Sequence, residues 1–347
     1  MSDANNFRCK IKNLDTSLWV LMDGKIVDNQ NSEFLEKGVS ITSIENENGL
    51  QISVAENVAV SKPIQIVSAI QTVQPLNFRQ IFKIILAKNA TLTLLHCDDS
   101  LQKEQTDILN NVEITLAENA VMNYYKMENK DAGSVLTNKI RVEQKAGSRF
   151  YSNVITFNAG KVNNFLHVNL NEPFADAQLN GLYLVDKKQE ICNEVKVFHN
   201  SPDCTSRQLY KGIADDEAHA VFNGHIVVQK DVQRTSAYQV NKNIALTDDA
   251  HIQAQPFLEI YADDVKCSHG ATVGQLDEDA LFYLRSRGIC HKNARMLLMF
   301  AFANEVAQTV KIEALRERLS QMIQQRLKGE LHICSQCALH CEHRREG

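Results

Sequence analysis

The chain has 347 residues, a formal net charge of −5 and a hydrophobic content of 44%, which allows one large domain or two modest ones. A weakly acidic chain without a basic run gives no support to nucleic-acid binding, and no stretch approaches the ~20 apolar residues of a membrane helix. The nine cysteines, with no apolar secretory segment at the N-terminus, favour reduced thiols in a cytoplasm. We therefore expect a cytoplasmic protein with no nucleic-acid and no membrane partner.

Residues 1–77 have the composition of short strands separated by polar turns, and they form a strand-rich segment leading into the rest of the chain. The run WVLMDGKIVD sets two apolar stretches on either side of Asp23 and Gly24. An Asp-Gly pair in this setting is a strong signal for a two-residue β-hairpin turn. The sequence therefore predicts a hairpin here.

Residues 78–274 are rich in strand-forming residues and show little helical periodicity. A unit recurs in which a polar residue precedes a small one, and alternating apolar residues follow. The small residues are Ala90, Ala120, Gly147, Ala177, Ala218 and Ala250. A repeat of this size, built from strands and turns, is typical of a parallel β-helix whose stacked coils bury their inward faces. The alternative is an all-β sandwich with irregular strand spacing.

The small residue of each unit suits the tight corner where one face of a coil turns into the next. The longest interval between these residues runs from Ala177 to Ala218. This interval predicts an inserted loop or an additional face in that coil.

Residues 275–328 are predicted to form three helices. Asp277 is the expected N-cap of the first helix, and Gly288 is expected to end it. The second helix, over about 291–310, is predicted to share one apolar face: Ala294, Leu297, Leu298, Ala301, Phe302 and Val306. The third, over about 311–327, carries a narrow apolar stripe: Ile312, Leu315, Leu319, Met322, Ile323 and Leu327. Such a stripe indicates core packing, or on a terminal helix a docking face for a partner.

Cys267 and His269 stand two residues apart on a predicted strand end, so their side chains point to the same side of the strand. A thiolate beside an imidazole can bind a soft or borderline metal, or carry sulfur. The alternative is a buried thiol next to a structural histidine.

Residues 329–347 form a tail rich in cysteine and histidine. A four-ligand set for zinc or iron can be drawn from Cys334, Cys337, Cys341 and His343. The alternative is a frayed terminus with free thiols. The chain carries no Gly-rich phosphate loop of the G-x4-G-K-[ST] form, so we expect any ATP hydrolysis to belong to another chain.

The stretch DDVKCSHGATVGQLDEDALFYLRSRGI, residues 263–289, closely resembles the C-terminal core of the SufB/SufD family. Its KCSHGAT portion has the form carried by the SufD branch. The resemblance continues through residues 205–260, and in weaker form it covers about residues 18–328.

This resemblance implies a mainly β fold, a right-handed parallel β-helix with a C-terminal helical subdomain. It implies a non-enzymatic scaffold that assembles and transfers iron–sulfur clusters with a SufB-like subunit and a SufC-like ABC ATPase, which grips the helical subdomain. Cys267 and His269 would lie near the seam with the SufB-like subunit and offer ligands to a transient iron–sulfur cluster shared with it. Because the two β-helices are homologous, the isolated chain is expected to form a homodimer through the same seam.

Four segments are thus expected: a strand-rich segment over 1–77, a β-helix core over 78–274, a helical subdomain over 275–328 and the tail over 329–347. Two other functions remain open. One is a carbohydrate-active β-helix enzyme of the pectin-lyase type, against which the cysteines and the missing secretory segment count. The other is a metal-binding adaptor acting through the tail.

Overall fold

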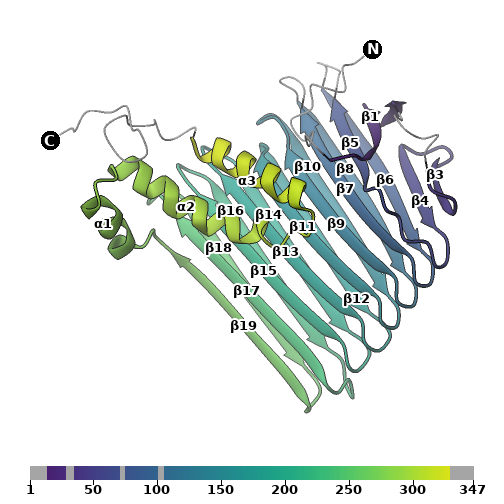
Figure 1. Ribbon diagram of the computed structural model, residues 1–347. Coiled ribbons are helices and arrows are strands. Elements are labelled where there is room, and N and C mark those ends of the chain that lie inside the picture. Colours follow the sequence, from purple (N-terminus) through teal and green to yellow (C-terminus); the bar gives the residue numbers. More distant parts are fainter. Residues whose placement is uncertain (1–13, 29–34, 71–74, 101–104, 329–347) are drawn as a thin grey trace.

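The computed structural model describes residues 14–28, 35–70, 75–100 and 105–328. Strands that alternate along the chain belong to two different sheets, so each coil of the chain contributes one strand to each sheet (Figure 1). Successive strands of a sheet pair in parallel, except at the N-terminal end. The predicted parallel β-helix is therefore confirmed, and a C-terminal helical region follows it.

The first sheet has ten strands in the order β19-β17-β15-β13-β11-β9-β7-β5-β1-β2. Its strands are β1 (Ser17–Met22), β2 (Lys25–Asp28), β5 (Ile64–Ile70), β7 (Thr91–Ser100), β9 (Val121–Asn129), β11 (Arg149–Asn158), β13 (Asp176–Val185), β15 (Thr205–Ala214), β17 (Thr235–Ala245) and β19 (Val265–Gly274).

The second sheet has nine strands in the order β18-β16-β14-β12-β10-β8-β6-β4-β3. Its strands are β3 (Val39–Ser43), β4 (Gly49–Val54), β6 (Leu76–Leu86), β8 (Thr106–Leu116), β10 (Val135–Gln144), β12 (Lys161–Leu170), β14 (Glu190–His199), β16 (His219–Val228) and β18 (His251–Ile260). The helices are α1 (Glu278–Ser286), α2 (His291–Ala307) and α3 (Glu313–Lys328).

Both sheets finish with an antiparallel strand at their N-terminal end. β2 turns back on β1 through Asp23 and Gly24, whose φ values of 50° and 80° are the left-handed pair that a type I′ turn requires. The predicted hairpin is thus present. β3 pairs antiparallel with β4 and closes the second sheet in the same way.

In-register parallel pairing stacks equivalent residues of successive coils into columns inside the β-helix. One such column contains, in order, Phe82, Val112, Ile140, Leu166 and Val195, and all of them are buried. Burying an aliphatic or aromatic side chain of this size stabilises the fold by about 1.5–3 kcal/mol. The alternating apolar residues of the sequence are the source of these columns.

The small residues of the sequence repeat lie at two different corners of the coil. Ala90 and Ala120 directly precede β7 and β9 in one sheet, whereas Ala218 and Ala250 directly precede β16 and β18 in the other. The long interval that ends at Ala218 is therefore a change of sheet, and the predicted inserted loop or additional face is wrong.

The register shows which residues share the corner before the strands of the ten-stranded sheet. They are small and buried: Ala90, Ala120, Ser148, Ala175, Cys204 and Thr235. Gly147 lies one residue before this column, and Ala177 lies inside β13. Serine, cysteine and threonine fill the corner as alanine does, so a search for Ala and Gly alone misses them.

The polar residue ahead of this corner also has a structural role. Asn57, Asn89 and Asn119 have φ values of 60°, 57° and 57°, which asparagine adopts more readily than most residues. Asn89 Nδ2 donates to Asn57 Oδ1 at 2.7 Å, and Asn119 Nδ2 donates to Asn89 Oδ1 at 3.2 Å. Gly147, with a φ of 63°, takes this position in the next coil.

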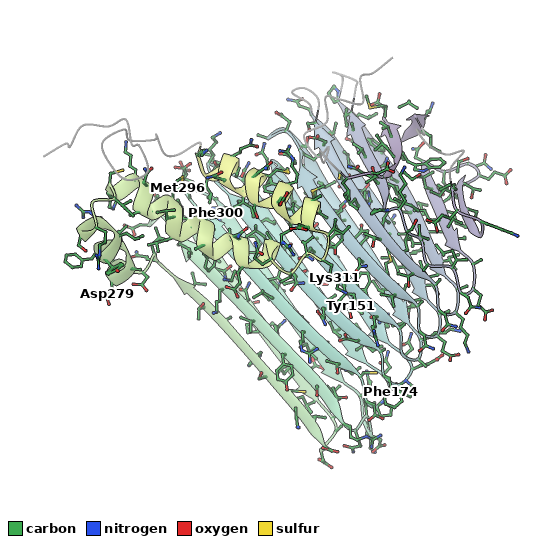
Figure 2. All side chains as sticks on the ribbon, viewed as in Figure 1. Tyr151, Phe174, Asp279, Met296, Phe300 and Lys311 are labelled. Atoms are coloured by element: carbon green, nitrogen blue, oxygen red, sulfur yellow. The ribbon has the colours of Figure 1, made fainter. Side chains whose placement is uncertain are left out.

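The first helix begins and ends as predicted. The Asp277 carboxylate accepts a hydrogen bond from the Ala280 backbone N–H at 3.0 Å, and Gly288 follows the helix with a φ of 85°. α1 lies beyond the last strand of the β-helix, at the end of the molecule where Figure 2 labels Asp279.

α2 and α3 cover the outer face of the ten-stranded sheet (Figure 1), where their buried side chains join one apolar cluster with outward-facing residues of that sheet. The α3 stripe is confirmed as core packing: Leu315, Leu319, Met322, Ile323 and Leu327 are buried and Ile312 packs against them. The predicted α2 face is wrong in part, since the buried apolar residues are Ala294, Met299, Ala303, Val306 and Ala307. Apolar residues surround α2 on most sides, so the sequence pattern did not single out the face toward the sheet.

Polar contacts fix the helices on the sheet. The buried Lys211 ammonium pairs with Glu305 and donates to the Phe302 carbonyl at 3.2 Å. After α2, the Lys311 ammonium lies 3.0 Å from the centre of the Tyr151 ring (Figure 2). Among the described helices, none is long and apolar enough to cross a membrane.

Candidate functional site

The C-terminal end of the β-helix is formed by two strands that each pair on one side only. β18 pairs with β16 and β19 pairs with β17, and each is the last strand of its sheet. Large apolar side chains are exposed here, including Phe257, Ile260, Tyr261 and Val273. Unpaired backbone groups beside apolar side chains are a ready template for another chain.

Cys267 and His269 both lie on the edge strand β19 and belong to columns that point into the β-helix. Cys267 is in register with Ala237 of β17, and His269 is in register with Gln239, and both β17 residues are buried. The two candidate side chains therefore continue the inward-facing columns at the open end, where no further coil covers them.

The environments of the two side chains differ. Cys267 is half-buried and packs against an apolar cluster that includes Ile226 and Val232. This burial raises the pKa of the Cys267 thiol above its ordinary value, against the opposing effect of a hydrogen bond with the Ala237 backbone. The thiol is thus protonated at neutral pH, and a metal or sulfur donor must displace its proton.

His269 is exposed, and no hydrogen bond or ion pair ties it to another described residue. Its neighbour in register, Gln239, is 1% exposed and uses Nε2 to donate to Gln208 Oε1 at 2.8 Å, while Gln239 Oε1 has no partner. A neutral imidazole binds a metal without losing a proton first, so His269 is the more available of the two candidates.

Within the described ranges, no group of three or more His, Cys, Asp or Glu side chains is arranged to hold a metal ion. This end of the β-helix therefore offers a thiol and an imidazole, and a complete ligand set needs donors from elsewhere. The ligand role of Cys267 and His269 stays a prediction. The tail candidates Cys334, Cys337, Cys341 and His343 lie outside the described residues, and the four-segment division also stays a prediction.

A polar cluster inside the β-helix was not anticipated from the sequence. One column of the nine-stranded sheet is a buried asparagine ladder. Asn110 Nδ2 donates to Asn138 Oδ1 at 2.9 Å, Asn138 Nδ2 to Asn164 Oδ1 at 2.9 Å, and Asn164 Nδ2 to Asn193 Oδ1 at 3.1 Å. From the facing sheet, Glu128 accepts from Asn138 at 2.8 Å, from Asn164 at 3.1 Å and from the Thr156 hydroxyl.

An ion pair lies in the same interior, between Lys126 and Asp98, and neither side chain reaches solvent. Burial raises the pKa of Asp98, but Lys126, His96 and Lys130 together outweigh it and leave that pKa below its ordinary value. Burial, assisted by Lys126, lowers the pKa of His96 to about 3, so this imidazole is neutral. Burial also raises the pKa of Glu128 to about 7.

A signal for this cluster exists in the sequence. Asparagines recur at the spacing of one coil, at Asn110, Asn138, Asn164 and Asn193. Each stands in an alternating strand with apolar residues at both i−2 and i+2. Asparagine is uncommon in strand interiors, so an asparagine that recurs at the same position of successive strands indicates a hydrogen-bonded ladder.

The comparisons agree with the resemblance seen in the sequence. The family model described as SUF system FeS cluster assembly, SufBD core domain, matches residues 71–302. The iron–sulfur cluster assembly protein SufD of Escherichia coli strain K12 is 44% identical over 143 residues, which are 41% of this chain and 34% of that protein.

Two further relatives are iron–sulfur cluster assembly SufBD family proteins. That of Synechocystis is 32% identical over 248 residues, covering 69% of this chain and 55% of the relative. That of Mycobacterium leprae is 36% identical over 169 residues, covering 46% of this chain and 43% of the relative. The matches thus span between about a third and just over half of the length of these relatives. The chain belongs to the SufBD core family of the SUF iron–sulfur cluster assembly system, on its SufD-like side.

Proposed function

We propose that this chain is a SufD-type scaffold subunit that assembles iron–sulfur clusters and passes them on, together with a SufB-like subunit and a SufC-like ATPase in the cytoplasm. Family membership and the relative named SufD support the proposal. The observation that carries it is the position of Cys267 and His269 on an edge strand, paired on one side only, at the open end of the β-helix. In this proposal the chain performs no catalysis of its own.

The cluster is cargo in this proposal, held between two subunits. His269 and Cys267 supply one or two ligands, and the SufB-like subunit supplies the others. A mixed set of imidazole and thiolate around iron is less tightly held than four thiolates, which suits a cluster that must be released. The raised pKa of the Cys267 thiol makes His269 the first ligand and Cys267 the second.

Two surfaces serve the partners in this proposal. The open end formed by β18 and β19 meets the homologous β-helix of the SufB-like subunit, and in its absence a second copy of this chain. The ATPase binds the helical region. Because the apolar stripe of α3 is buried against the sheet, the contact falls on α1, where Phe282 is 74% and Tyr283 57% exposed.

The proposal is tested by replacing His269 with alanine in a strain that depends on this pathway. We expect the activity of iron–sulfur enzymes to fall severalfold, because an essential cluster ligand is lost, while the variant still co-purifies with its two partner subunits. His251→Ala is the matched control, since His251 is an exposed histidine on the other edge strand and its side chain faces outward. Normal iron–sulfur enzyme activity in the His269→Ala strain would show that the motif is structural.

A further inference from the structure

A cavity of about 520 Å³ opens on the outer face of the nine-stranded sheet, whereas α2 and α3 cover the other sheet. Its walls come from β6, β8, β10 and β12. β14 and β16 separate these strands from the edge strand β18, so the cavity is distinct from the candidate site at the open end. A volume of this size is typical of small-molecule sites.

The strand register brings the side chains of the cavity together in two rows. Lys139 lies between Asn111 and Phe165 on adjacent strands. Two residues further along the same strands, Arg141 lies between Glu113 and His167. Each row therefore sets a basic side chain next to an aromatic or imidazole ring.

Arg79 reaches the cavity from β6 and adds a third basic side chain. With the Asn111 amide turned so that its oxygen faces Arg79, this oxygen accepts from Arg79 Nε at 2.6 Å and from Nη2 at 3.2 Å. The amide fixes the guanidinium without neutralising its charge. Glu113 is the single carboxylate in the lining, and Glu143 pairs with Arg141 from outside it, so Arg79 and Lys139 are the lining cations that no carboxylate of the described residues pairs with.

Residues outside the lining hold two of the remaining groups in place. Arg141 Nε contacts Glu143 Oε1 at 3.1 Å, and His167 Nε2 contacts Glu194 Oε1 at 3.0 Å. The Lys139 ammonium is not paired with any other described residue, so its full charge faces the cavity. Because these rings and guanidinium groups are oriented beforehand, less side-chain entropy is lost when a ligand binds.

We infer that this cavity binds a small organic anion in which a flat apolar group carries a phosphate or carboxylate. The apolar part lies against Phe165, and the anionic part is bound by Lys139 with Arg79 and Arg141. Bidentate guanidinium contacts suit phosphate and carboxylate oxygens, and an aromatic floor favours a flat ring. Neither a purely apolar molecule nor a bare anion uses both halves of the cavity.

Calorimetric titration of the full chain with 1-naphthyl phosphate tests the inference, with 1-naphthol and inorganic phosphate as the two partial ligands. We expect saturable binding with a dissociation constant below about 1 mM, and at least about tenfold weaker binding of either partial ligand. Lys139→Glu should weaken binding of 1-naphthyl phosphate by about tenfold or more, and Phe165→Ala by a similar factor.

Lys145→Glu is the matched control, since it makes the same charge change at the end of the same strand but outside the cavity. Its affinity for 1-naphthyl phosphate should remain within about twofold of wild type. Thermal unfolding of each variant checks that the fold is kept, and Lys139→Gln replaces Lys139→Glu if the charge reversal unfolds the chain. Absence of saturable binding, equal weakening by Lys145→Glu, or equal binding of 1-naphthol or inorganic phosphate would overturn the inference.

Discussion

The Glu128 carboxylate accepts hydrogen bonds from three side chains, yet it lies where no solvent reaches it. Asn138, Asn164 and Thr156 donate to it, and the Lys126–Asp98 pair lies in the same interior. The donors favour the charged carboxylate, but the loss of water around it costs more and raises its pKa to about 7. The interior of the β-helix therefore changes charge near neutral pH.

We expect the Glu128→Gln variant to gain stability relative to wild type as the pH rises from about 4.5 to about 7. The pKa of Glu128 is raised from 4.5 to about 7, so across this window the folded protein holds a proton that the unfolded chain has released. Stability due to the protonated carboxyl is complete below the lower value and is lost as the pH passes the upper one, by about 3 kcal/mol in total. Denaturant unfolding at a series of pH values measures the difference.

His96 and His199 act in the opposite direction over an overlapping range. Burial lowers their pKa values to about 3 and about 4, so each contributes stability that is lost as the pH falls below 6.5. Both histidines are present in wild type and variant, so the difference between the two proteins isolates Glu128. A difference that stays constant across the window would contradict the raised pKa.

The sequence motif singled out Cys267 and His269 as candidates, but the sequence did not predict how the interior of the neighbouring coils packs. A Cβ on Gly181 would lie 2.1 Å from the Tyr210 ring, and one on Gly212 would lie 2.0 Å from the Tyr183 ring. Each glycine makes room for a tyrosine of the adjacent coil. Such a pairing depends on which residues become neighbours when the coils stack. A local sequence pattern does not predict this register between coils.

At the scale of a single element, α1 carries the large apolar side chains that the described helices expose. Leu281 is its one buried residue, while Phe282 and Tyr283 face solvent. A helix of nine residues is only marginally stable by itself. The Asp277 cap stabilises it, and a partner protein bound to its apolar side would stabilise it further.

We expect Phe282→Ser to weaken binding of the SufC-like ATPase by about tenfold or more, because a large exposed aromatic side chain is a typical interface anchor. Phe174→Ser is the matched control: Phe174 is 67% exposed at a corner of the β-helix far from the helices (Figure 2). Co-purification and calorimetry with the ATPase measure both variants. Equal binding by the two variants would rule out α1 as the contact.

Local sequence signals predicted those elements that depend on neighbours in the chain. The Asp23-Gly24 turn, the Asp277 cap and the α3 stripe each follow from residues within a few positions of one another. The prediction of the buried α2 face was wrong in part because the helix is apolar on several sides. A group distant in the sequence, the buried Lys211, helps to orient it. Tertiary contacts of this kind are absent from a local pattern.

At the scale of the whole molecule, the two ends of the β-helix differ. Antiparallel strands close both sheets at the N-terminal end, whereas β18 and β19 leave both sheets open at the other. The sequence predicted the stacked fold but assigned its small residues to one corner, because alanines at both corners follow a similar polar residue. Only the pairing of coils separates the two series.

We expect the isolated chain to dimerise through its open end, and Val273→Lys to weaken that dimer by about tenfold or more. A lysine on the edge strand β19 places a charge among the apolar side chains that the second copy would cover. Val27→Lys is the matched control, because Val27 is 53% and Val273 48% exposed and Val27 lies at the closed end. Sedimentation equilibrium measures the dissociation constants. A monomeric wild type, or equal weakening by Val27→Lys, would contradict the proposed interface.

The antiparallel strands β2 and β3 also give the molecule a direction of growth. In a stack where each coil contacts only its neighbours, folding can propagate as in a one-dimensional crystal. Coils are added one at a time to the exposed end of the stack, which is its growing front. The reversed strands end the parallel stack at one front, because their chain direction is opposite to that of the coils. The other front, at β18 and β19, stays open because α1 follows β19 in place of a further strand, so a second molecule can supply the next layer.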